Sequence, residues 1–130
     1  MNLEEGMIVQ FTHQFPVLPV ADVIKSQEFY RDDFQFTMDW TNRDQFDCVS
    51  NCAISLFFAK SIDFTPGHVL VWNADNADPI YEEYKAAGTK IVEGLETRSW
   101  GIREFVVEDL NGHRIRVGHI DESIADYSQI

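Results

Sequence analysis

The chain has 130 residues, of which 45% are hydrophobic, and a formal net charge of −12 at pH 7. This length suits one domain, and the apolar content predicts a packed core, which argues against a disordered chain. Scattered Lys and Arg residues argue against phosphate neutralisation on nucleic acid, and no apolar run approaches the roughly 20 residues of a membrane span.

The start of the sequence and its two cysteines predict a cytoplasmic protein. Glu4 and Glu5 stand where a signal peptide would carry positive charge. Cys48 and Cys52 have neither the spacing of a redox motif nor that of a zinc site. We therefore expect both thiols to be reduced.

Residues 10–60 predict one strand, one helix and three further strands. Phe, Val and Leu favour a strand over residues 11–20, and its two prolines place that strand at a sheet edge. Asp22 is the expected helix N-cap. The apolar stripe of this helix contains Val23, Gln27, Tyr30 and Phe34. Three strand-like runs follow at residues 36–42, 45–49 and 53–59, with a tight turn at Ser50–Asn51 between the last two.

Residues 67–120 predict the same order of elements. Residues 68–74 form a strand, and Asp78 followed by Pro79 begins a helix. The buried stripe of this helix contains Ile80, Tyr84 and Ala87, and Gly88 ends it. Three strands follow at residues 90–95, 103–108 and 114–120, with a hairpin turn at Asn111–Gly112.

The repeated order predicts an α+β fold with two βαβββ modules and curved mixed sheets. Residues 10–60 form the first module and residues 67–120 the second, within a single domain over residues 1–130. One such module curls its strands into a half-open cup that cannot bury its concave face alone. Two cups together enclose a cavity, and the function is expected there.

Two segments carry a family resemblance. One runs from Pro16 to Asp32, and the other contains Trp100-Gly101-Ile102-Arg103-Glu104-Phe105 followed by Glu108 to Ile115. They resemble the first strand and helix and the penultimate hairpin of the vicinal-oxygen-chelate (VOC) superfamily, which includes glyoxalases, bleomycin-resistance proteins and extradiol dioxygenases. The second segment is most similar to bleomycin-resistance-like members. The resemblance implies the two-module fold, a homodimer and a small-molecule ligand.

The resemblance also bears on metal binding, because glyoxalase-type members hold a divalent metal with four side chains. Carried over one by one, these positions fall on Phe15, Ser55, His68 and Arg116. Only His68 is a metal ligand, and the permanently charged Arg116 would repel a cation. His13 shares the predicted strand face of Phe15 and would pair with His68, but a third ligand is lacking. We expect no metal and no cofactor.

Several other residues have more than one interpretation. Trp40, Trp72 and Trp100 lie in or beside strands that should face or rim the cavity, where indole rings attract planar or cationic guests. Trp72 is equally suited to the core. Arg116 either pairs with an anionic group of the ligand or neutralises a buried carboxylate such as Glu104. His113 is expected in a solvated loop, and His119 on the strand face opposite Arg116, with a surface or interface role.

Two functions follow. The first is a metal-independent small-molecule-binding protein that sequesters an aromatic or amphipathic ligand in a sheet-lined cavity. Its predicted ligand-binding residues are His13, Phe15, Trp40, Ser55, Phe57, His68, Trp100 and Arg116. The alternative is a glyoxalase-like, metal-assisted lyase or isomerase that uses His68 as general base. Catalysis is therefore left open, with His68 as the candidate catalytic residue.

Overall fold

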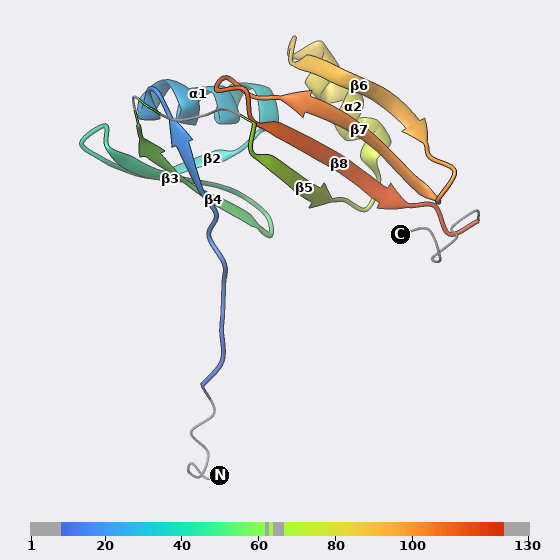
Figure 1. The fold of residues 1–130 in the computed structure, drawn as a ribbon, viewed down its shortest axis with the longest axis horizontal. Coiled ribbons are helices and arrows are strands. Elements are labelled where there is room, and N and C mark those ends of the chain that lie inside the picture. The colour runs from blue at the N-terminus through green and yellow to red at the C-terminus, as the bar shows by residue number, and fades with distance from the viewer. Residues whose placement is uncertain (1–8, 62, 64–66, 124–130) are drawn as a thin grey trace.

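The computed structural model describes residues 9–61, 63 and 67–123, and it contains two βαβββ modules of the same topology (Figure 1). The first module comprises β1 (Val17–Val20), α1 (Val23–Phe34), β2 (Thr37–Asn42), β3 (Phe46–Asn51) and β4 (Ile54–Lys60). The second comprises β5 (Val69–Asn73), α2 (Ala77–Ala86), β6 (Lys90–Thr97), β7 (Ile102–Glu108) and β8 (Arg114–Ile120). Their four-stranded mixed sheets have the orders β1-β4-β3-β2 and β5-β8-β7-β6. The predicted α+β fold is confirmed.

Both helices begin at side chains that satisfy free backbone amides. The Asp22 side chain accepts a hydrogen bond from Lys25 N, as predicted for α1. The second helix begins slightly earlier than predicted, because Asn76, and not Asp78, is its N-cap. Gly88 has a φ of 84° just beyond α2, a backbone conformation that ends a helix and favours glycine.

The two helices cover the same side of the molecule, and each sheet turns outward the face that lies away from its helix (Figure 1). One continuous core joins the modules on the helix side. The ring of Phe34 in α1 lies 4.7 Å from that of Tyr84 in α2, and Phe36 lies 5.3 Å from Trp72 of β5. Trp72 thus belongs to the core. Among the described residues, no helix is long and apolar enough to cross a membrane.

The turn between β7 and β8 folds inward and fastens the second module to the first. Its side chains Asp109, Asn111 and His113 form what we call the clasp. Tyr30 Oη donates to Asp109 Oδ2 over 2.7 Å, while Asp109 Oδ1 accepts from the Asn111 and His113 amides. The pKa of both Tyr30 and Asp109 is raised, and burial is the largest cause in each case.

The clasp also holds the start of α1. Asn111 Nδ2 donates to Ser26 Oγ over 2.9 Å, and Asn111 Oδ1 accepts from Ala21 N. His113 Nε2 hydrogen-bonds Pro19 O at 2.8 Å. His113 is fully buried, so the prediction of a solvated loop residue is wrong. The turn itself is as predicted, but it packs on α1 of the other module.

Two other local predictions differ from the structure. β1 covers only Val17–Val20. Residues 9–14 extend away from the body without joining a sheet (Figure 1), whereas Phe15 stacks on Phe57 and Pro16 O accepts from Phe57 N. The prediction of a strand from residue 11 is therefore wrong over that segment. The β3–β4 turn lies at Cys52 and Ala53, two residues later than predicted, with Cys52 at a φ of 52°.

Candidate functional site

The face of the first sheet that is turned away from α1 carries a cluster of aromatic rings. We call it the aromatic face, and it contains Phe15, Trp40, Phe46 and Phe57. Phe57 is central: it stacks on Phe15 at 4.7 Å between centroids, and lies 5.0 Å from Phe46 and 5.6 Å from Trp40. Phe15 and Trp40 remain 40% and 44% exposed, so a ligand can reach both rings.

The strand register explains this arrangement. Trp40 of β2 and Phe57 of β4 both lie opposite Cys48 of β3, so all three side chains share one face. An irregularity in β2 between Met38 and Trp40 lets the neighbouring Asp39 reach the same face. There Ser50 Oγ donates to Asp39 Oδ1 over 3.1 Å. Burial raises the pKa of the Cys48 thiol to about 11, which keeps it protonated and poorly nucleophilic.

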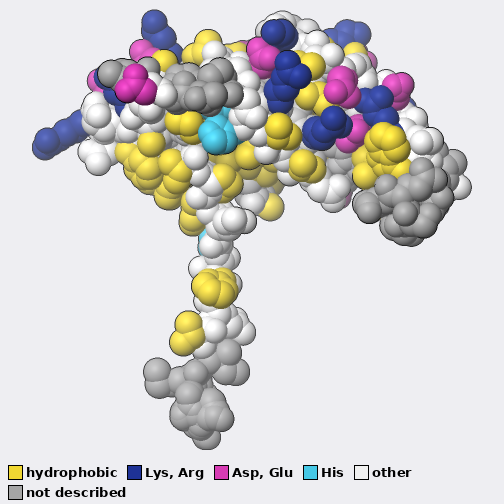
Figure 2. Space-filling model, viewed as in Figure 1, with side chains coloured by type: hydrophobic (Ala, Val, Ile, Leu, Met, Phe, Trp, Pro, Cys, Tyr) yellow, Lys and Arg dark blue, Asp and Glu magenta, His cyan; other side chains and the backbone are white. Residues whose placement is uncertain are grey.

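The corresponding face of the second sheet carries ion pairs. We call it the ionic face, and it contains Glu93, Glu96, Arg98, Glu104 and Arg116. Glu104 Oε2 lies 2.7 Å from Arg116 Nη1 and 3.3 Å from Arg98 Nε. The Glu104 side chain is only 9% exposed, so its two guanidinium partners offset its desolvation. Lysine, arginine and acidic side chains gather over this sheet in Figure 2.

Five of the predicted ligand-binding residues belong to the first module, and the structure brings three of them together. These three, Phe15, Trp40 and Phe57, form most of the aromatic face. The His13 ring lies 5.7 Å from that of Phe15, just outside the sheet. Ser55 borders a separate hollow of about 190 Å³ between β4 and β5.

The other three predicted residues belong to the second module and do not converge. His68, just before β5, places its ring 5.0 Å from that of His113. Trp100 lies exposed in the β6–β7 turn. Arg116 lies on the ionic face, where it neutralises the buried Glu104, the second of its two predicted roles.

The sequence did not single out Phe46, Asp39 or the Arg98 network. Phe46 could have been found from the sequence, since it lies two residues before Cys48 and four before Ser50 and so shares their face of β3. Arg98 follows β6 outside any periodic segment, so no pattern indicated its contacts. His119 lies on the face of β8 opposite to that of Arg116, as predicted. Its Nδ1 accepts from Ala77 N at the start of α2.

The family model of the Glyoxalase/Bleomycin resistance protein/Dioxygenase superfamily matches residues 9–117. The chain belongs to this superfamily. No match was found among the curated proteins.

Solved structures share the fold of this VOC protein. TioX from Micromonospora sp. ML1 is 20% identical, with a TM-score of 0.75 over 85% of this chain and 99% of that one. A bleomycin-binding protein in complex with bleomycin is 18% identical, with a TM-score of 0.73 over 84% and 98%. A lactoylglutathione lyase from Agrobacterium tumefaciens is 15% identical, with a TM-score of 0.70 over 83% and 93%. At these identities the likeness shows the fold alone.

Some members of this superfamily hold a divalent metal, and the residues here do not fit one. Phe15 packs on Phe57, and Arg116 is engaged with Glu104, so neither position offers an electron pair to an ion. Within residues 9–61, 63 and 67–123, no three His, Cys, Asp or Glu side chains gather as a metal site.

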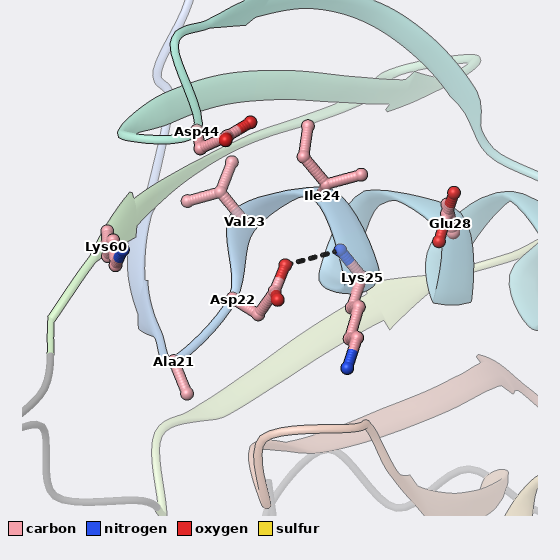
Figure 3. Close-up of a pocket in the computed structure, with 8 residues that line it drawn as sticks. All are labelled: Ala21, Asp22, Val23, Ile24, Lys25, Glu28, Asp44 and Lys60. Atoms are coloured by element: carbon pink, nitrogen blue, oxygen red, sulfur yellow. Dashed lines mark hydrogen bonds between the residues drawn. The ribbon is translucent and has the colours of Figure 1, made fainter.

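Another hollow, of about 350 Å³, lies at the start of α1 (Figure 3). Its charged side chains are Asp22, Lys25, Glu28, Asp44 and Lys60. All five are exposed, and the carboxylate of Asp22 already accepts from Lys25 N. The mixed, solvated charge gives this hollow no preference for an anion or a cation, so we assign it no ligand.

Proposed function

We propose that this VOC protein is a metal-independent binding protein that sequesters a planar aromatic or amphipathic small molecule on the aromatic face. One observation carries the proposal: Phe15 and Trp40 stay exposed beside Phe46 and Phe57, in contact with one another through Phe57. Exposed aromatic clusters of this kind cost free energy in water and provide a stacking surface for a flat guest. The bleomycin-binding relative supports a small-molecule ligand.

The charge around the aromatic face favours a cationic guest. Asp39 places a carboxylate beside the rings, and the chain carries a net charge of −12. A cation over an indole or phenyl face gains about 0.5–2 kcal/mol, more when it is desolvated. A flat cation would therefore combine stacking on Trp40 with attraction to Asp39.

A second copy of the chain would close the site. Apolar side chains stand exposed on the open faces and along residues 9–16, namely Val9, Phe11, Val17, Val69, Val71 and Ile120. Figure 2 shows hydrophobic side chains on the extended segment, clear of the body. Such a segment, with apolar Val9, Phe11 and Phe15 alternating with polar residues, has the pattern of a strand that lacks a sheet. We therefore propose a homodimer in which this segment docks on the partner.

The binding test is a titration of tryptophan fluorescence with proflavine, a planar cation, against 2-naphthoate and cyclohexylammonium. We expect proflavine to bind most tightly, because it alone offers both a flat ring system and positive charge. Trp40→Leu keeps the apolar bulk but removes the indole face, and should weaken proflavine binding about tenfold. Leu110→Ala, at an exposed position on the β7–β8 turn, is the matched control. Equal affinity for cyclohexylammonium would refute the stacking site.

The dimer is tested separately by sedimentation equilibrium. Phe11→Asp and Val71→Asp place a charge at two exposed apolar positions and should shift the protein to monomer. Leu110→Asp makes the same change on an exposed side chain outside these faces and should leave the dimer intact. A wild-type protein that stays monomeric at high concentration would contradict the dimer.

The alternative, a metal-assisted lyase or isomerase, depends on His68. No specific contact in the structure favours it, since His68 is exposed and its ring packs on that of His113. Elemental analysis after incubation with Ni²⁺, Zn²⁺, Mn²⁺ or Fe²⁺ distinguishes the two proposals. A stoichiometric, chelator-sensitive metal whose binding is lost in His68→Ala would favour the enzyme.

A further inference from the structure

The two modules can be aligned residue by residue from their own geometry. Matching the N-caps Asp22 and Asn76 makes Tyr30 equivalent to Tyr84, and Ser26 equivalent to Ile80. The β1–β4 and β5–β8 registers extend the match, so Pro19 corresponds to Asn73. In both modules the matched tyrosine is buried. The surface of the first module that receives the clasp therefore has a counterpart in the second.

That counterpart is a pocket of about 290 Å³ on the helix side of the molecule. The clasp contacts Pro19, Ala21, Ser26 and Tyr30 of the first module. The equivalent positions in the second module all line the pocket: Asn73, Asp75, Ile80 and Tyr84. The pocket thus occupies the place where a second clasp would insert.

The β3–β4 turn does not fill this place. By register, Asn51 corresponds to Asp109 and Ile54 to His113, with only Cys52 and Ala53 between them. The clasp turn has three residues at the same point and reaches further. Asn51 instead donates through Nδ2 to Gln35 O over 3.2 Å. Ile54 has no group to hydrogen-bond the backbone of β5.

The Tyr84 hydroxyl is left without a partner in the described part of the chain. Tyr84 is buried, with only 5% of its surface exposed, and it lines the pocket. Burial, and then the charge of Glu83, raises its pKa, so the hydroxyl keeps its proton and can donate it in a hydrogen bond. The other walls are apolar and include Phe36, Trp72 and Val117.

We infer that this pocket is a second binding site, which takes a small uncharged molecule with an apolar body and a carbonyl oxygen. In the clasp, Asp109 and Asn111 supply oxygen acceptors to Tyr30 Oη and Ala21 N. A ligand carbonyl would accept from Tyr84 Oη in the same way. An anion is disfavoured because Asp75 lines the pocket and Glu83 acts on Tyr84. The volume lies near the lower limit of small-molecule sites.

The test is a ¹H–¹⁵N NMR titration of the full chain with acetophenone, ethylbenzene and benzoate. Acetophenone should shift the amides of Asp75, Ile80 and Tyr84, and bind at least fivefold more tightly than ethylbenzene, which lacks the carbonyl. Benzoate should bind more weakly than acetophenone. Tyr84→Phe should reduce the affinity for acetophenone to that for ethylbenzene and leave ethylbenzene binding unchanged.

Tyr30→Phe is the matched control, because it removes the equivalent hydroxyl from the clasp and should not alter acetophenone binding. Ala53→Phe, at an exposed position on the pocket rim, should block both neutral probes. Acetophenone shifts that are absent here, or confined to Trp40 and Phe57, would overturn the inference. So would unchanged acetophenone affinity in Tyr84→Phe. The site lies apart from the aromatic face, so failure here leaves the proposed function intact.

Discussion

The same two positions hold an aromatic pair in one module and an ion pair in the other. By register, Phe46 corresponds to Glu104 and Phe57 to Arg116. The phenyl rings lie 5.0 Å apart, and the carboxylate and guanidinium lie 2.7 Å apart. The two sheets therefore keep equivalent strand registers although the side chains on their open faces differ.

One difference between the modules on the helix side is a buried carboxylate. Asp47 of the first module corresponds to Phe105 of the second, and both are fully buried. Phe105 packs on Tyr81 and Tyr84. Both carboxylate oxygens of Asp47 lack a hydrogen-bond partner in the described part of the chain. Burial alone raises the pKa of Asp47 to about 7.

Substitutions in the two β-hairpin turns should differ most in their effect on the free energy of unfolding. Asp109→Ala removes a buried acceptor and leaves Tyr30 Oη and two backbone amides unsatisfied. We expect a loss of about 3–4 kcal/mol in the free energy of unfolding, measured by urea denaturation. Asn51→Ala, the equivalent change, removes one exposed hydrogen bond and should cost less than about 1 kcal/mol. Equal losses would mean that the clasp does not join the modules.

The second prediction concerns Asp47 and pH. The folded state keeps the Asp47 proton up to about pH 7, whereas the unfolded chain loses it near pH 4. The stability that the fold derives from a protonated Asp47 is therefore complete below about pH 4 and is lost as the pH rises through 7. Asp47→Asn, which needs no ionisation, should be more stable than wild type at pH 8 by on the order of 2–4 kcal/mol.

Thermal unfolding between pH 4 and 8 checks this prediction. The gap between Asp47→Asn and wild type should grow with pH and level off above 8. Asp44→Asn, an exposed carboxylate near the same strand, provides the control and should give no growing gap. A pH-independent gap for Asp47→Asn would show that the carboxylate finds a partner in solution.

The third prediction compares Gly118 with Ala59, its equivalent in the first module. A Cβ on Gly118 would lie 2.8 Å from Arg103 O and 2.9 Å from Glu104 Cβ, closer than real contacts allow. Gly118→Ala should therefore cost about 2 kcal/mol of unfolding free energy, measured in urea. Gly94→Ala, whose Cβ would meet only Tyr81 Oη at 3.6 Å, should be tolerated. Tolerance of alanine at both positions would contradict the close strand approach.

The sequence predicted the elements better than it predicted their partners. The N-cap at Asp22 and the strands over residues 103–108 and 114–120 follow from local sequence patterns, and both predictions were confirmed. The burial of His113 depends on Pro19, more than ninety residues earlier, so local turn chemistry could not show it. Arg116 had two predicted partners, and the β7–β8 register, in which Val106 pairs with Arg116, places Glu104 diagonally beside Arg116. Residues 9–15 have a strand pattern, but they pair with no strand of the described chain.

The smallest predicted effect separates the two equivalent tyrosines. Tyr30→Phe removes the donor to the buried Asp109 and should cost about 1–2 kcal/mol of unfolding free energy in urea. Tyr84→Phe removes a hydroxyl that has no partner among the described residues, so its cost should lie within about 0.5 kcal/mol of zero. A cost for Tyr84→Phe as large as that for Tyr30→Phe would mean that ordered water already bonds Tyr84 Oη. The free pocket would then be hydrated, and a carbonyl ligand would have to displace that water.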